Sequence, residues 1–277
     1  MIWLQEVILD PLTVPFMQRA LMASLLIGCS CAVFSCFLVL KGWSLMGDAV
    51  AHSVLPGLAL AYLFGIPMAI GAFVAGLFCA LGTGFVKAHS RLKEDAVMGI
   101  FFSGMFAFGL VLLSRVESEV NLLHVLFGNV LGIRPHELLE SALIAGFSMV
   151  FLLLKRKDFL LYCFDPTQAH ISALSNRFLH FSLLVVLALT IVSALKAAGI
   201  ILVIAMLIAP GAIAHLLTQS FDQMLMVAVG TAIFSSFAGV LLSFHFDLAT
   251  APSIVLTQSF IFILCFVSRP RSLHYAH

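Results

Sequence analysis

Long apolar runs separated by short polar connections fill most of the chain. The hydrocarbon core of a bilayer is about 30 Å thick, so a helix that crosses it needs about 20 apolar residues. Nine runs reach this length, with bounds near 18–40, 44–64, 66–87, 94–114, 138–154, 178–196, 198–218, 222–244 and 250–268. Since 178–196 and 198–218 are nearly continuous, eight or ten spans also fit the pattern. The pattern predicts an all-α polytopic membrane protein of about eight or nine helices.

The connections between the runs leave no room for a second domain. The stretch 120–133 (VNLLHVLFGNVLGI) is apolar but too short to cross a bilayer, so we expect a re-entrant or interfacial helix there. The only sizeable polar connections are 115–137 and 155–177. We therefore predict one transmembrane domain over residues 1–277.

Basic residues indicate the orientation of the chain, because loops on the cytoplasmic side carry an excess of Lys and Arg. With the N-terminus outside, ten of the 14 basic residues fall in inner connections: Lys41, Lys87, Arg91, Lys93, Lys155, Arg156, Lys157, Arg177, Arg269 and Arg271. The other four fall outside: Arg19, Arg115, Arg134 and Lys196. The bias predicts an external N-terminus and a cytoplasmic C-terminus, which requires an odd number of spans.

Composition agrees with a membrane protein and excludes a soluble enzyme, a disordered chain and a DNA-binding module. About 62% of the residues are hydrophobic and 10% are charged, whereas soluble domains average about 25% charged residues. A net charge of +1 gives no basic surface for nucleic acid. The six cysteines include no Cys-x-x-Cys pair, and we expect them to be packing residues. Membrane lipid is the expected surrounding of the chain, and nucleic acid is not an expected partner.

Two ionisable residues in the second run need a reason to be there, because such groups are costly inside a bilayer. Asp48 and His52 are four residues apart, so on a helix they share one face. Counted from Ser44 at the cytoplasmic edge, His52 lies about 12 Å into the membrane. A carboxylate and an imidazole suit manganese, iron or zinc as divalent ions. A mutually satisfied pair that pins neighbouring helices, or a proton relay without metal, also fits the spacing.

A Pro-Gly dipeptide occurs in each half of the chain, at Pro56-Gly57 and at Pro210-Gly211. Proline removes a backbone donor and frees a carbonyl, which can line a cavity or coordinate a cation. Paired interruptions of this kind point to a central translocation path. We therefore expect both dipeptides to line such a path.

The chain has no G-x-x-x-x-G-K-[ST] motif, so it does not bind ATP as P-loop proteins do. H-E-x-x-H and G-x-S-x-G are absent as well, which leaves no motif for an enzyme. A transporter of this kind uses an ion gradient or a separate ATPase.

The segment 164–175 (FDPTQAHISALS) favours a separate ATPase as the source of energy. Asp165 is suited to cap a short helix and Pro166 to occupy its first position. Ala169, Ile171 and Leu174 are expected to dock on a partner; an ordinary interfacial helix is the alternative.

These residues together make the chain resemble the membrane subunits of zinc/manganese/iron-type bacterial ABC importers, from about residue 12 to residue 270. The matching segments are GDAVAHSVLPG (47–57), KEDAVMGIFFS (93–103), FDP (164–166), AAGIILVIAMLIAPGAIAHLLT (197–218) and DLATAPSIVL (247–256). The first and the fourth are specific, whereas KED and FDP alone are weak signals.

The resemblance implies a type II ABC importer in the bacterial inner membrane. It implies a second permease subunit (a copy or a paralogue), a cytosolic ATPase subunit on each half, and a periplasmic or lipoprotein metal-binding protein as donor. It also implies that Asp48 and His52 lie on the ion path and that the 164–175 helix transmits the motion of the ATPase. The metal is then cargo, and no permanently bound cofactor is expected. A proton-coupled secondary metal transporter that uses Asp48 and His52 as its relay is the alternative.

Overall fold

The computed structural model describes residues 14–115, 132–133 and 135–268. Nearly all of these residues are helical, and the described part of the chain contains no strand. It contains nine helical segments long and apolar enough to cross a membrane, as the hydropathy pattern predicts. Most of the segment 120–133, for which we expect a re-entrant or interfacial helix, lies outside the described residues.

The helices follow the predicted runs closely. In chain order they are α3 (Pro15–Lys41), α4 (Met46–Phe64), α5 (Met68–His89), α6 (Glu94–Arg115), α8 (Pro135–Leu154), α9 (Arg156–Phe164), α10 (Pro166–Ile171), α11 (Asn176–Leu217), α12 (Phe221–Phe246) and α13 (Thr250–Ser268). The short α9 and α10 occupy the polar connection between the fifth and sixth spans.

The helix α11 contains two spans rather than one. Gly199 interrupts it with φ 74° and ψ 169°, a backbone conformation that residues other than glycine rarely adopt. The break separates the spans Asn176–Leu195 and Ala197–Leu217. The first span starts beside α10, and the second leads into α12, whose Asp222 pairs with Arg156 of α9 at 2.8 Å. Both ends of α11 therefore lie at one end of the molecule, which we call the α10 end.

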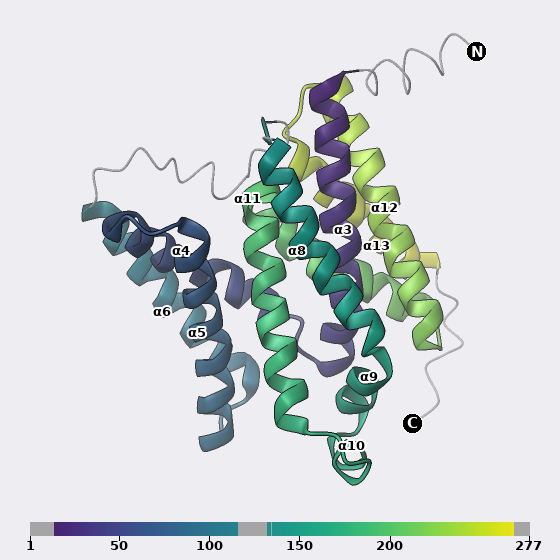
Figure 1. The fold of residues 1–277 in the computed structure, drawn as a ribbon. Helices are drawn as coiled ribbons and strands as arrows, with labels where there is room; N and C mark the ends of the chain where they lie inside the picture. The colour runs from purple at the N-terminus through teal and green to yellow at the C-terminus, as the bar shows by residue number, and fades with distance from the viewer. Residues whose placement is uncertain (1–13, 116–131, 134, 269–277) are drawn as a thin grey trace.

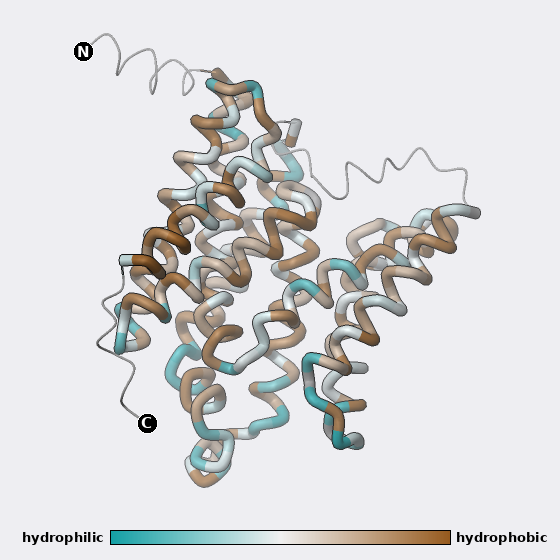
Figure 2. Tube along the Cα trace, turned by 180° about the vertical axis from the view of Figure 1, so that it is seen from behind, coloured by the Kyte–Doolittle hydropathy of each residue, from teal (hydrophilic) through white to brown (hydrophobic). Residues whose placement is uncertain are grey.

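The two halves of α11 form the centre of the bundle (Figure 1), where they contact α3, α4, α5, α8, α12 and α13. Helices α4, α5 and α6 pack on one another and stand as a group to one side, joined to the rest mainly through α11. Figure 2 shows apolar positions along the lengths of the helices and polar positions gathered at the α10 end and in the connection between α5 and α6. This distribution is the one expected for helices that cross a bilayer.

The outer faces of α5 and α6 are exposed and apolar. Phe78, Phe85 and Ile100 are each at least half exposed. An apolar surface of this kind is unfavourable in water and favourable against lipid or another apolar subunit. The α4–α6 group thus presents a surface that requires covering by the membrane or by a partner.

Candidate functional site

Asp48 and His52 lie side by side in the first half of α4. The Nε2 atom of His52 is 3.3 Å from the Oδ1 atom of Asp48. The Asp48 side chain is 33% exposed and the His52 side chain is 20% exposed, so neither is sealed in the core of the chain. The four-residue spacing predicts this proximity, and the helix is continuous through both residues.

Two aromatic rings from α6 hold the other side of the imidazole. The rings of Phe102 and Phe106 meet the His52 ring edge-on, with centroids 5.0 and 5.3 Å away. The Nδ1 atom of His52 is buried and has no hydrogen-bond partner. The rings therefore orient the imidazole so that Nε2 faces the carboxylate, while Nδ1 is left unsatisfied on the side that the protein covers.

The pair by itself is an incomplete metal site. Within the described residues, no group of three or more His, Cys, Asp or Glu side chains is placed to hold a metal ion. A hard or borderline divalent cation takes four to six ligands, roughly. The described residues of one chain thus bring a carboxylate and an imidazole together here, which is fewer ligands than such an ion takes.

The beginning of α4 rests on the second half of α11. A Cβ atom added to Gly47 would lie 3.0 Å from the side chain of Leu207. Glycine therefore permits a close contact between the first turn of α4, which also carries Asp48, and Leu207, three residues before Pro210.

The first Pro-Gly dipeptide lies where α4 makes close contact with α5 and α6. A Cβ atom on Gly57 would collide with the backbone of Gly71 in α5, and one on Gly109 of α6 would lie 2.8 Å from the backbone nitrogen of Pro56. The small residues bring the backbones of α4, α5 and α6 together at this level.

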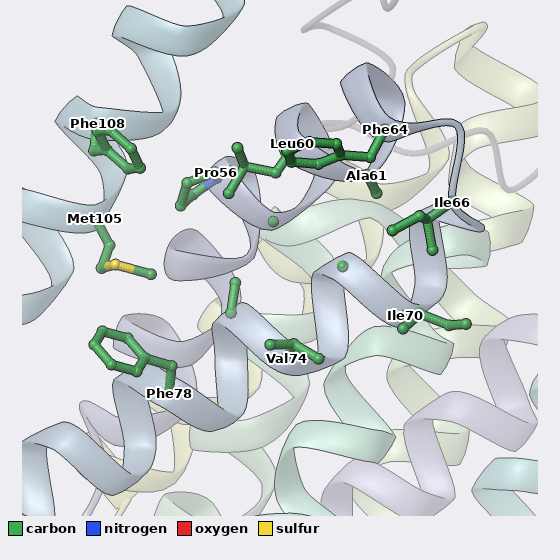
Figure 3. Close-up of a pocket in the computed structure, with 13 residues that line it drawn as sticks. Pro56, Leu60, Ala61, Phe64, Ile66, Ile70, Val74, Phe78, Met105 and Phe108 are labelled. Atoms are coloured by element: carbon green, nitrogen blue, oxygen red, sulfur yellow. The ribbon is translucent and has the colours of Figure 1, made fainter.

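The same three helices enclose a pocket of about 470 Å³ beside this contact (Figure 3). Pro56 and Gly57 line it, but Asp48 and His52 do not. The complete lining is Pro56, Gly57, Leu60, Ala61, Phe64, Ile66, Ile70, Gly71, Val74, Ala75, Phe78, Met105 and Phe108. Since none of these side chains offers a ligand for a hard cation, this pocket is unsuited to a hydrated metal ion. The expected ion path along Pro56 and Gly57 therefore stays a prediction, and this pocket is not part of it.

The backbone around the second Pro-Gly dipeptide is hydrogen-bonded by a serine that the sequence pattern does not single out. The hydroxyl of Ser35 in α3 accepts a hydrogen bond from the backbone N–H of Gly211 at 2.9 Å and donates one to the carbonyl of Ile208 at 3.0 Å. Pro210 interrupts the ladder of α11, and a side chain from a neighbouring helix satisfies groups at the interruption.

The short helix α10 forms as its sequence predicts. The carboxylate of Asp165 accepts hydrogen bonds from the backbone N–H groups of Thr167 and Gln168 at 2.8 and 3.0 Å, and Pro166 occupies the first turn. The amide nitrogen of Asn176 donates to the carbonyl of Pro166 at 2.7 Å and ties α10 to the start of α11.

The outward face of α10 differs from the expected one. Ala169 is fully buried within the chain, and Leu174 is partly buried against the core. Both residues anchor the segment on its own subunit, so the expectation that Ala169 presents itself to a partner is wrong. Ile171 is the large apolar side chain that α10 exposes, at 80%.

The fold and the site together define a polytopic membrane protein with an ionisable pair inside one span, an arrangement typical of membrane transport proteins. The model of the ABC 3 transport family matches residues 13–269. The chain belongs to this family.

Relatives extend the match over almost the whole chain. The chelated iron transport system membrane protein YfeD of Yersinia pestis is 56% identical over 262 residues, which cover 95% of this chain and 88% of the relative. The manganese transport system membrane protein MntB of Synechocystis is 47% identical over 95% of this chain and 86% of its own length. The solved structure of PsaBC from Streptococcus pneumoniae in complex with Fab contains a chain of similar fold, with a TM-score of 0.86, 33% identity and 96% coverage of both chains.

Proposed function

We propose that this chain is the permease subunit of an ABC importer that carries divalent transition metal ions (manganese, iron or zinc) across the bacterial inner membrane. Its family membership and the names of its iron and manganese relatives support this function. The observation that carries the proposal is the Asp48–His52 pair, a carboxylate and an imidazole 3.3 Å apart inside a span. Both are ligands for divalent transition metals.

The pair is proposed to act as a transient site on the ion path. Its two side chains are partly exposed, so a passing ion can replace part of its hydration shell with protein ligands. A second permease subunit, either a copy or a paralogue, would bring a corresponding pair and raise the number of protein ligands to about four. Binding must stay modest, because an ion held too tightly is not released.

The energy for transport is proposed to come from a separate cytosolic ATPase subunit that contacts α10. The chain lacks a P-loop motif, and α10 projects an exposed apolar residue, Ile171, from a segment anchored by Asp165, Pro166, Ala169 and Leu174. The bias of basic residues supports an orientation with the α10 end in the cytoplasm and the N-terminus outside. A periplasmic or lipoprotein metal-binding protein would then deliver the ion at the opposite end.

Reconstitution in proteoliposomes tests this function. The permease is incorporated with and without its ATPase subunit, in the presence of the metal-binding protein, and manganese uptake is measured with ATP inside or outside the vesicles. The proposal requires uptake that depends on the ATPase and on ATP at the α10 end. Uptake by the permease alone, driven by a proton gradient, would instead identify a proton-coupled transporter with Asp48 and His52 as its relay.

A further inference from the structure

Four side chains from four different segments meet at the α10 end. They are Lys41 at the end of α3, Trp43 in the connection from α3 to α4, Tyr162 in α9 and His180 in the second turn of α11. Trp43 is 3% exposed and Tyr162 is 6% exposed, so the cluster is packed inside the protein. We call these residues the Trp43–His180 cluster.

Polar and aromatic contacts hold the cluster together. The hydroxyl of Tyr162 is 3.0 Å from Nδ1 of His180, and the His180 ring meets the Trp43 ring edge-on with centroids 5.3 Å apart. The amino group of Lys41 lies 4.0 Å from the centroid of the Tyr162 ring and donates a hydrogen bond to the carbonyl of Tyr162 at 3.3 Å. A buried network of this kind fixes the relative orientation of its members more strictly than apolar packing does.

The backbone of Trp43 links the end of α3 to the start of α4. Gly42 ends α3 with φ 74°, and the backbone N–H of Trp43 donates to the carbonyl of Leu38 at 2.8 Å. The carbonyl of Trp43 accepts from the N–H of Met46, the first residue of α4, at 3.0 Å. A displacement of Trp43 is therefore transmitted to the first turn of α4, where Asp48 lies.

The other side of the cluster is attached to α10. Tyr162 lies on the last turn of α9. This turn is followed directly by Asp165, which caps α10. His180 lies one turn after Asn176, whose side chain is bonded to Pro166 of α10. A movement of α10 therefore reaches the cluster along two routes, through α9 to Tyr162 and through the start of α11 to His180.

We propose that Tyr162, His180 and Trp43 are positioning residues that couple the movement of α10 to the position of Asp48 and His52. This inference rests on the proposed function, because it assumes that the ATPase acts on α10. The cluster connects the two sites by contacts between buried side chains, and the hydrogen bond between Tyr162 and His180 joins its α9 part to its α11 part. Loss of that bond separates Tyr162 from His180 and weakens the transmission from α10 to the start of α4, while the contact of His180 with Trp43 remains.

The variant Tyr162→Phe removes this hydrogen bond and keeps the ring that packs under Lys41. The matched control is Tyr62→Phe, the same change on an exposed residue in the last turn of α4. Each variant is assembled with the ATPase subunit and the metal-binding protein in proteoliposomes. The quantity measured is the number of manganese ions imported per ATP hydrolysed, together with the yield of assembled complex.

The inference predicts that Tyr162→Phe assembles normally, hydrolyses ATP and imports about two- to tenfold fewer ions per ATP, the range expected for the loss of one hydrogen bond in the transmitting step. The Tyr62→Phe control should keep the wild-type ratio. His180→Phe, which removes the other partner of the bond, should give the same loss, and the double variant should be little worse than either single one.

Three results would overturn the inference. An unchanged number of ions per ATP in both Tyr162→Phe and His180→Phe would show that the cluster transmits nothing. Parallel losses of assembly, ATP hydrolysis and import at a constant ratio would show a purely structural role. A wild-type complex without ATP-dependent import would refute the proposed function itself, and the coupling inference with it.

Discussion

The contact of Ser35 with the interrupted second half of α11 yields a stability prediction with a magnitude. The variant Ser35→Ala removes the acceptor for the N–H of Gly211 and the donor for the carbonyl of Ile208, both of which lie within 3.0 Å of the serine hydroxyl. Ser35 is fully buried, so no water replaces the lost hydroxyl unless the helices separate.

The expected cost follows from the two lost bonds. A buried donor or acceptor left unsatisfied costs about 1–3 kcal/mol in soluble proteins, whereas hydrogen bonds between membrane helices average about 0.6 kcal/mol and reach about 1.7 kcal/mol. For two such bonds we expect a total loss of about 1–3 kcal/mol. In a protein of this size that corresponds to a lower melting temperature by about 2–10 °C.

Thermal unfolding of the purified protein in detergent measures this loss. The matched control is Ser103→Ala, because Ser103 is exposed and its hydroxyl donates within its own helix, to the carbonyls of Gly99 and Ile100. The control should melt within about 1 °C of the wild type. Equal melting temperatures for Ser35→Ala and the wild type would refute the reasoning that Ser35 satisfies the interruption at Pro210.

Three further predictions concern α10, the ion site and α9. Ile171→Asp should weaken binding of the ATPase subunit in a pull-down without lowering the stability of the permease. Ala169→Asp should instead destabilise the permease itself by several kcal/mol, because it buries an unpaired charge. The opposite pattern would show that the ATPase contact lies elsewhere. Phe106→Ala should free the His52 ring and change the affinity for manganese measured by calorimetry, and an unaltered affinity would show that the ring does not position His52. Burial raises the pKa of the Cys163 thiol to about 11, so its modification by a maleimide, followed by mass spectrometry, should be slow at pH 7 and accelerate as the pH rises toward 9; fast labelling at pH 7 would contradict its burial under α3.

The membrane spans follow from the sequence because lipid imposes a strict rule on the backbone. Each crossing must be a helix about 20 residues long, so the apolar runs determine where the helices lie. The proximity of Asp48 and His52 follows for a similar reason, since both residues belong to one helix. The break at 196–198 is placed correctly to within a few residues, and Gly199 supplies its physical cause.

Contacts between helices are not determined by such local rules. The partners of His52 in α6 and of Gly211 in α3 depend on how distant segments pack. The outward face of α10 was predicted wrongly at Ala169 because a helix of six residues is too short for a periodic pattern to distinguish its buried side from its exposed side. The Pro-Gly dipeptides also depend on packing that the sequence does not determine locally, because their glycines are needed where other helices approach closely.

The central claim is that Asp48 and His52 contact the ion during ATP-driven import, and manganese uptake by the reconstituted complex of Asp48→Asn tests it most directly. The variant keeps the shape of the side chain and removes its charge; Asp247→Asn, the same change at an exposed residue with φ 52°, is the control. We predict that Asp48→Asn assembles with its partners but loses most of its ATP-dependent uptake, while the control imports at the wild-type rate. Uptake by Asp48→Asn at the wild-type rate would contradict the claim and leave the pair a structural contact within α4.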